Sequence, residues 1–338
     1  MAGLRHSLFV VALAGAVPAM AAPFTIGESG ESYQTLAAAV AAIGDGQGTI
    51  LVAPGRYGDC AVQTAGHIAY RAVQPLTAIF DGGICEGKAV LVLRGRGATV
   101  DGLVFENLKV PDGNGAGIRI EQGPLTVANS IFRDSEEGIL GGGDDPASDI
   151  SIDRSTFSGL GRCDRGLACA HSIYLSAYRS VTVRRSRFER GRGGHYVKSR
   201  AARIAIADCS FDDSQGRATN YMIDLPEGAV GRIERNIFLQ GADKENHAAF
   251  IAVAAEARRN PSSGLLIAGN RAHKVKAASW PTALLADWSD SPKRMGSNLI
   301  GTGIDPVLSV KAEPPSFIGR VKGRLRYYVG RLRDRLAG

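Results

Sequence analysis

The sequence has 338 residues, and its 40 Lys and Arg outnumber its 33 Asp and Glu, which gives a formal net charge of +7. Seven of the basic residues and one acidic residue lie in 316–338, and with Arg5 also set aside 32 basic residues face 32 acidic ones. The high pI therefore belongs to the end of the chain. It gives no argument for a polyanionic substrate of the body or for a nucleic-acid partner, and we expect no nucleic acid.

The first 21 residues have the organisation of a secretory signal. A basic start with Arg5 precedes an apolar run over 8–17, which is too short to span a bilayer. Ala19 and Ala21 supply the small residues that a signal peptidase needs. We expect residues 1–21 to be removed near Ala21, so that the mature protein is secreted or periplasmic.

Residues 32–43 (SYQTLAAAVAAI) predict an amphipathic helix, because Leu36, Val40 and Ile43 fall on one stripe. The stretch GDGQGTILVAPGRY follows it directly. If the body that comes next is a stack of strands, such a helix would cover its first layer and the unpaired strand edge there.

One short pattern recurs between Gly117 and Asn270: an apolar strand, a turn, a second strand, and a small residue two places before an aromatic one. Its copies are NSIF (129–132), RSTF (154–157), RSRF (185–188), DCSF (208–211) and RNIF (235–238). Counted from Phe105, the phenylalanines are 27, 25, 31, 23 and 27 residues apart. A period in this range indicates a solenoid, whose units are too small to bury a core alone and must stack.

Short apolar runs rather than helical spacing fill each unit, which predicts strands and an all-β fold. The runs are IRI (118–120), ISI (150–152), VTV (181–183), IAI (204–206) and MIDL (222–225). Parallel pairing of one coil on the next would align the phenylalanines in one interior ladder. A second interior ladder would contain the residues two places earlier, namely Ser130, Ser155, Ser186, Cys209, Asn236 and Asn270.

This organisation resembles the right-handed parallel β-helix of the pectate lyase superfamily. The helix predicted over 32–43 and the strand after it look like the N-terminal cap of that superfamily. We therefore expect one right-handed parallel β-helix domain over 22–310.

Export would make disulfides possible, and the positions of the five cysteines in the sequence indicate which of them could pair. Cys163 and Cys169 flank a short segment of one loop, where a disulfide would hold the loop in place. Cys60 and Cys85 are about one coil apart, a separation at which stacked coils bring residues close. We expect both pairs to form disulfides, and we interpret Cys209 in the interior ladder as a small buried thiol rather than a nucleophile.

Residues 316–338 predict a basic amphipathic helix with Arg and Lys opposite an apolar stripe, and Ser316 suits its N-cap. Two interpretations stay open. The helix could be a lid over the last coil, or it could bind an anionic membrane surface or polysaccharide.

Alternation within the strands predicts which side chains face outward. Tyr174, Lys198 and Asp224 would form one outward column on three consecutive coils, about 4.8 Å apart. Arg119 would continue this column toward the N-terminus. Tyr196 and Arg200 flank Lys198 on its own strand, and the result would be a surface groove at mid-solenoid.

The passages HYVKSRAARIAIADCSF and MIDLPEGAVGRIERNIF are similar to the alginate lyase and chondroitinase B family, with Lys198 and Ser199 matching its Lys-Ser pair. The resemblance implies cleavage of a uronate-containing polysaccharide by β-elimination. Pro226 stands where the family carries its catalytic arginine, so Arg200 could replace that arginine only by its place in space. Gly191 and Gly193 replace the acidic calcium ligands of the family, and calcium is not carried over.

In the lyase interpretation Arg200 neutralises the substrate carboxylate, Lys198 removes the C5 proton, and Tyr174 or Tyr196 protonates the leaving oxygen. The base must be a neutral amine, so the pKa of Lys198 would have to fall by roughly three units from about 10.4. Arg200 favours that fall and Asp224 opposes it. The rival interpretation is an ion pair between Lys198 and Asp224 on an exposed sheet, which stabilises little.

Two further groups are weaker candidates. His171 and His195 begin adjacent coils, and strand parity points them inward or into the corner, which favours a structural stack over acid–base work. Asp144, Asp145 and Asp149 could hold calcium through carboxylate oxygens, but a solvated loop is the simpler interpretation.

Together these patterns predict a secreted β-helix that acts on a polysaccharide, with Tyr174, Lys198 and Arg200 catalytic and Arg119, Tyr196 and Asp224 binding substrate. The alternative is a non-catalytic carbohydrate-binding or envelope-structural β-helix. A C5-epimerase or hydrolase would share the groove without producing unsaturated ends. Fold alone does not separate these classes.

Overall fold

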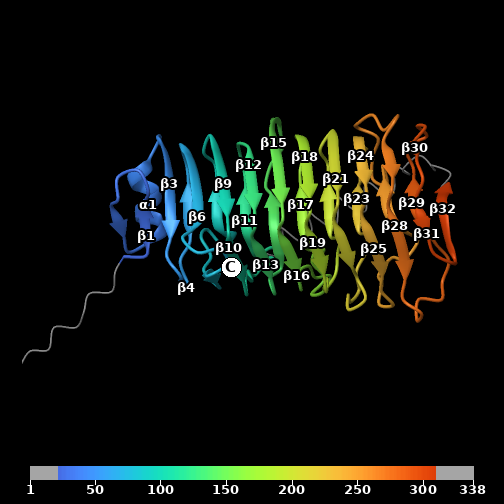
Figure 1. Cartoon of the computed structure of the whole chain (residues 1–338), viewed down its shortest axis with the longest axis horizontal. Helices are drawn as coiled ribbons and strands as arrows, with labels where there is room; N and C mark the ends of the chain where they lie inside the picture. The colour runs from blue at the N-terminus through green and yellow to red at the C-terminus, as the bar shows by residue number, and fades with distance from the viewer. Residues whose placement is uncertain (1–21, 310–338) are drawn as a thin grey trace, which may run out of the picture.

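The computed structural model describes residues 22–309, and the predicted signal (1–21) and terminal helix (316–338) lie outside them. The described chain is a parallel β-helix whose coils succeed one another along its longest axis, with α1 (Leu36–Ile43) at one end and β32 at the other (Figure 1). Each coil contributes one strand to each of three sheets. The predicted all-β solenoid is confirmed.

Sheet A has 12 strands, here in spatial order: β2 (Ser32–Tyr33), β1 (Phe24–Ile26), β3 (Gln47–Val52), β6 (His67–Ala72), β9 (Gly97–Asp101), β12 (Leu125–Ala128), β15 (Asp145–Asp153), β18 (Tyr178–Arg184), β21 (Arg203–Ala207), β24 (Val230–Glu234), β27 (Leu266–Ala268) and β30 (Arg294–Met295). Sheet B has 10 strands: β4 (Gly55–Tyr57), β7 (Ala78–Asp81), β10 (Leu103–Glu106), β13 (Ile131–Arg133), β16 (Thr156–Ser158), β19 (Arg187–Glu189), β22 (Ser210–Asp212), β25 (Ile237–Gln240), β28 (Arg271–Lys274) and β31 (Leu299–Ile300). Sheet C has 10 strands: β5 (Ala61–Gln63), β8 (Ala89–Leu93), β11 (Ala116–Ile120), β14 (Glu137–Gly141), β17 (Ile173–Leu175), β20 (Val197–Ser199), β23 (Ile223–Leu225), β26 (Ala249–Val253), β29 (Thr282–Asp287) and β32 (Ile304–Ser309).

The predicted phenylalanine ladder forms the centre of the core. From Phe105 to Phe238 each ring lies on its equivalent in the next coil, with centroids 4.7–5.0 Å apart. Strands in register keep these rings aligned, as in the pair Phe188 and Phe211. Because every ring is buried on both faces, the column supplies apolar contact along most of the stack.

The second interior ladder carries hydrogen bonds between coils. The backbone N–H of Ser130 donates to the Ser155 hydroxyl at 3.3 Å, and that of Asn236 donates to the Asn270 side-chain oxygen at 3.0 Å. Cys209 occupies the same ladder, is buried, and has no disulfide partner. Burial raises the pKa of its thiol to about 12, which agrees with its interpretation as a buried thiol.

The N-terminal cap differs from the predicted helix over 32–43 in its first turn. Ser32 and Tyr33 form β2, which pairs antiparallel with β1, and the helix begins only at Leu36. Thr35 is its N-cap, because the Thr35 hydroxyl accepts the N–H of Ala38 at 3.2 Å. Strand pairing at the sheet edge thus replaces the first helical turn.

Both predicted disulfides are present. Cys60 and Cys85 join neighbouring coils with a Cα separation of 5.6 Å, and Cys163 and Cys169 close their loop. Disulfides persist in oxidising compartments, which agrees with an extracellular location. In the described range, no helix is both long enough and apolar enough to cross a membrane.

We predict that Phe238→Ala lowers the free energy of unfolding by about 3–5 kcal/mol, because it removes a fully buried ring from the column. Its neighbour Ile237 is the matched control, since its side chain is 51% exposed and Ile237→Ala should change stability by only about 0.5 kcal/mol. Guanidinium denaturation followed by circular dichroism measures both. Equal losses would show that the column does not dominate the core.

Candidate functional site

The outward column predicted on sheet C is present. Tyr174 in β17 is in register with Lys198 in β20, which is in register with Asp224 in β23. Their neighbours Val197 and Ser199 are fully buried inside the coil, as alternation requires. The Lys198 ammonium lies 3.3 Å from an Asp224 oxygen.

This column is not the exposed surface that the sequence suggested. Lys198 is 8% exposed and Asp224 is 3% exposed, although both point away from the core of the coil. The turns after β20, β23 and β26 supply the charged side chains that surround them, from Arg200, Glu227 and Glu256. The ion pair is therefore a buried one, to which the low value of surface pairs does not apply.

Glu256 connects the two cations of the cluster. One of its carboxylate oxygens accepts from the Lys198 ammonium at 2.6 Å, and the other accepts from the Arg200 guanidinium at 2.5 Å. Its side chain is 45% exposed, so this carboxylate lies at the mouth of the cluster. One cation from β20 and one from the turn after it thus converge on a single carboxylate that solvent can reach.

Arg200 also links the column to its flank. Its Nε donates to the Tyr174 hydroxyl at 2.9 Å, and a terminal nitrogen donates to Glu227 at 2.8 Å. The charged groups of Lys198 and Arg200 both lie 5.7 Å from the centroid of the Tyr174 ring, a distance typical of cation–π contact. The sequence placed Tyr174, Lys198 and Arg200 together correctly.

Electrostatics keep this cluster charged. Burial lowers the pKa of Lys198, but the carboxylates of Asp224 and Glu256 outweigh burial, and the net shift is upward. Burial raises the pKa of Asp224 to about 6, against the opposing effect of Lys198. Burial also raises the pKa of Glu256, but Lys198 and Arg200 reverse the direction and lower it. Lys198 is therefore an ammonium ion rather than the neutral amine that a base requires.

His171 and His195 lie at the corner that precedes β17 and β20, which agrees with one of the two expected placements, and their rings face the outward column rather than the core. Nε2 of His195 is 3.5 Å from Asp224, and the His171 ring is edge-on to Tyr174 with centroids 5.5 Å apart. The two imidazoles are 4.9 Å apart, which confirms the stack itself. Burial lowers the pKa of His171 to about 3 and that of His195 well below its usual value, so both rings are neutral.

Tyr196 does not line the cluster. The prediction that it binds substrate placed its side chain in the groove, and that placement is wrong. It precedes β20, where the chain turns a corner and strict alternation does not hold. Its ring is 1% exposed between Phe188 and Phe211, and its hydroxyl donates to buried Asp213 at 2.7 Å.

Arg119 lies in the predicted column but two coils away from Tyr174, because Leu140 comes between them. Two coils correspond to about 10 Å. Its charged partner is Glu121, at 3.8 Å. Arg119 therefore lies outside the cluster of Lys198 and Arg200.

The aspartates considered for calcium have other partners. Asp145 accepts the N–H of Gly123, and Asp149 accepts from Arg179 and Ser180. In residues 22–309, one group of three side chains has metal-ligand spacing, and it consists of Cys163, Cys169 and Glu245. Both of its sulfurs are in a disulfide and are not free thiolates.

Comparison with known proteins places this geometry in a family context. The family model described as right handed beta helix region matches residues 89–257. No curated protein matches the sequence. Among solved structures, the chain is similar to PL6 family alginate lyase AlyGC, with 15% identity, a TM-score of 0.44, and coverage of 78% of this chain and 40% of that one. It is also similar to the Streptococcus pneumoniae surface protein and adhesin PfbA, with 12% identity, a TM-score of 0.33, and coverage of 78% and 90%. The chain spans about 40% of the length of the lyase, and neither likeness carries an argument about function.

We predict that the stability difference between wild type and Asp224→Asn depends on pH. Since the folded pKa of Asp224 is about 6 and its unfolded pKa is about 3.9, only the folded protein holds this proton between those values. The wild type should therefore lose stability relative to the variant as pH rises from 4 to 6, by an amount on the order of 2 kcal/mol.

Urea denaturation at several pH values measures this difference. The variant also loses a partner of Lys198, which shifts the whole curve of stability difference against pH. The slope of that curve is therefore the quantity that tests the prediction. A flat curve for Asp224→Asn would show that Asp224 is already ionised at pH 4.

Proposed function

This chain belongs to the right-handed β-helix family, and we propose that it binds a uronate-containing polysaccharide on the outer face of sheet C and cleaves it by β-elimination. The observation that carries this proposal is the position of the Glu256 carboxylate. Its carboxylate is held by both Lys198 and Arg200 beside the Tyr174 hydroxyl. The carboxylate of a sugar has the same charge and the same two acceptor oxygens, so it can replace that of Glu256.

Binding between two cations favours elimination, because neutralising the carboxylate stabilises the negative charge that develops when the adjacent C5 proton leaves. The raised pKa of Lys198 gives it this binding role, in place of the role of base that the sequence suggested. We assign proton transfer to Tyr174, whose oxygen is 2.9 Å from the nearest Arg200 nitrogen. Its phenolate form would take the C5 proton, the bond from C4 to the glycosidic oxygen would break, and the same proton would pass to that oxygen.

A non-catalytic carbohydrate-binding or envelope-structural role is the second candidate. The observation that favours it is that Lys198 and Arg200 are already fully paired, which is also what a purely structural network requires. Attachment to an anionic membrane surface through 316–338 and export through 1–21 both concern segments outside the described residues, and they stay predictions.

Incubation with a panel of uronate polymers, with and without calcium, tests the proposal. We expect absorbance from unsaturated uronate ends, reduced at least about 100-fold in Lys198→Ala, Arg200→Ala and Tyr174→Phe. Tyr174→Phe should retain polymer binding, because it removes only the hydroxyl. Lys276→Ala and Arg271→Ala remove the same charges at exposed positions and should keep full activity.

Two outcomes would contradict elimination. Silence across the panel with retained binding that depends on Lys198 and Arg200 would establish the non-catalytic role. Silence without binding would remove both carbohydrate roles from this face.

We predict that Glu256→Gln binds uronate oligomers about 10-fold more tightly than wild type, because the substrate no longer competes with a resident carboxylate. Isothermal titration calorimetry measures the affinity, with Glu245→Gln as a control at an exposed acid. If Glu256→Gln instead abolished turnover and left affinity unchanged, Glu256 would be part of the catalytic machinery rather than the group that the substrate displaces.

A further inference from the structure

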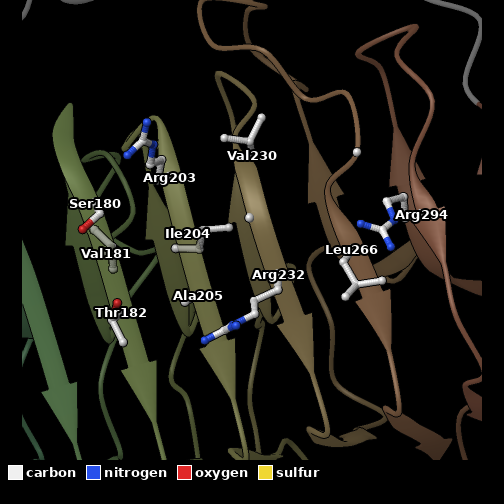
Figure 2. A pocket seen from close by; sticks show the side chains of 12 residues that line it. Ser180, Val181, Thr182, Arg203, Ile204, Ala205, Val230, Arg232, Leu266 and Arg294 are labelled. Carbon is white, nitrogen blue, oxygen red and sulfur yellow. The ribbon is translucent and has the colours of Figure 1, made fainter.

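A hollow of about 410 Å³ lies on the outer face of sheet A, away from the cluster on sheet C. It runs across β18, β21, β24 and β27 to the start of β30 (Figure 2). Figure 2 shows Ser180 and Thr182 at one end of the hollow and Arg294 at the other, with Arg203 on the strand next to β18 and the side chain of Arg232 extending from β24 toward β21.

Strand register explains why the surface is low here. Thr182, Ala205, Arg232, Leu266 and Arg294 occupy one column on five consecutive coils. Ala205 is the smallest of them and lies between Thr182 and Arg232. The floor of the hollow is thus made by short or apolar side chains, and its rim is made by arginines.

The charge of the hollow is of one sign. Arg203, Arg232 and Arg294 line it, and no acidic side chain does. Arg232 is 3.4 Å from Glu234, whereas Arg203 and Arg294 make no ion pair with any residue of 22–309. Asp149, which lies near Arg203, is already paired with Arg179. These guanidinium groups therefore keep donors available for a ligand.

A second hollow shows that this arrangement is not the rule on the surface. It is lined by Arg162 and Arg165, but also by Glu136 and Asp164. Arg162 binds Asp164 and Arg165 binds Glu136, so these two arginines are already neutralised.

We infer that the hollow on sheet A is an accessory binding site for a linear polysaccharide that bears carboxylates, lying along the axis of the stack. Arg232 and Arg294 are two coils apart, about 10 Å, and Arg203 is on the coil before Arg232. A linear chain with repeated carboxylates can meet these arginines in succession, since guanidinium groups bind carboxylates in bidentate fashion. Ala205 and Leu266 offer apolar contact to the faces of sugar rings.

The concave shape argues against a lipid surface as the ligand, because a flat bilayer would touch the rim and leave the floor at Ala205 empty. The inference rests on the proposed function only for the class of polymer. The site itself shares no residue with the cluster of Lys198 and Arg200.

Calorimetry with an octamer of galacturonate or mannuronate tests the site, in a Lys198→Ala/Arg200→Ala background so that sheet C does not contribute. We expect binding that weakens as salt rises. Arg203→Ala/Arg294→Ala should weaken it at least 10-fold, as should Ala205→Trp, which fills the floor and keeps every charge. Arg71→Ala/Arg96→Ala removes two exposed arginines elsewhere and should have no effect.

Other results would overturn the inference. Unchanged affinity in Arg203→Ala/Arg294→Ala and Ala205→Trp would do so whether or not elimination is observed. So would tighter binding of phosphatidylserine vesicles or of single-stranded DNA than of either octamer, lost in the same variants. Loss of octamer binding in these variants would support the accessory site even if no elimination activity exists.

Discussion

Register between coils is the constraint on which the rest of this structure depends. In sheet B each strand pairs in parallel with its equivalent, so that from Phe80 to Phe238 one phenylalanine meets another, as Phe132 meets Phe157. The rings stack at 4.7–5.0 Å, close to the spacing of about 4.8 Å between paired strands. The aromatic column and the backbone ladder therefore have the same repeat. A slip of one residue would turn the column toward solvent.

On the outer face of sheet C the same register has an energetic cost, whereas in the core it stabilises the fold. It sets Lys198 beside Asp224 under covering turns, where an unpaired charge would be costly. Glu256 offsets much of that cost, yet it comes from a partly exposed turn rather than from a strand. The cluster thus needs an acidic partner but does not require that particular one, which is the physical basis for exchange with a carboxylate from outside.

Sequence reasoning succeeded where local rules repeat. Alternation within strands and parallel stacking were enough to predict the phenylalanine ladder and the column of Tyr174, Lys198 and Asp224. It failed at strand ends. Tyr196 precedes β20 at a corner, and the chain turns its ring into the core. Glu256 was missed because it is 58 residues from Lys198, in a turn that carries no part of the repeat.

The ladder of Ser155, Asn236 and their equivalents has an evolutionary consequence. The coils of Ser155 and Asn236 each accept a backbone N–H from the coil before them and donate one to the coil after them, so coils of this kind are interchangeable at this joint. A change in length by one whole coil, which in the register of sheet B spans 23–34 residues, would therefore leave no gap in the ladder. An added coil between Lys198 and Asp224 would separate the ammonium from its carboxylate. A coil added on either side of that pair would leave the contact between Lys198 and Asp224 in place.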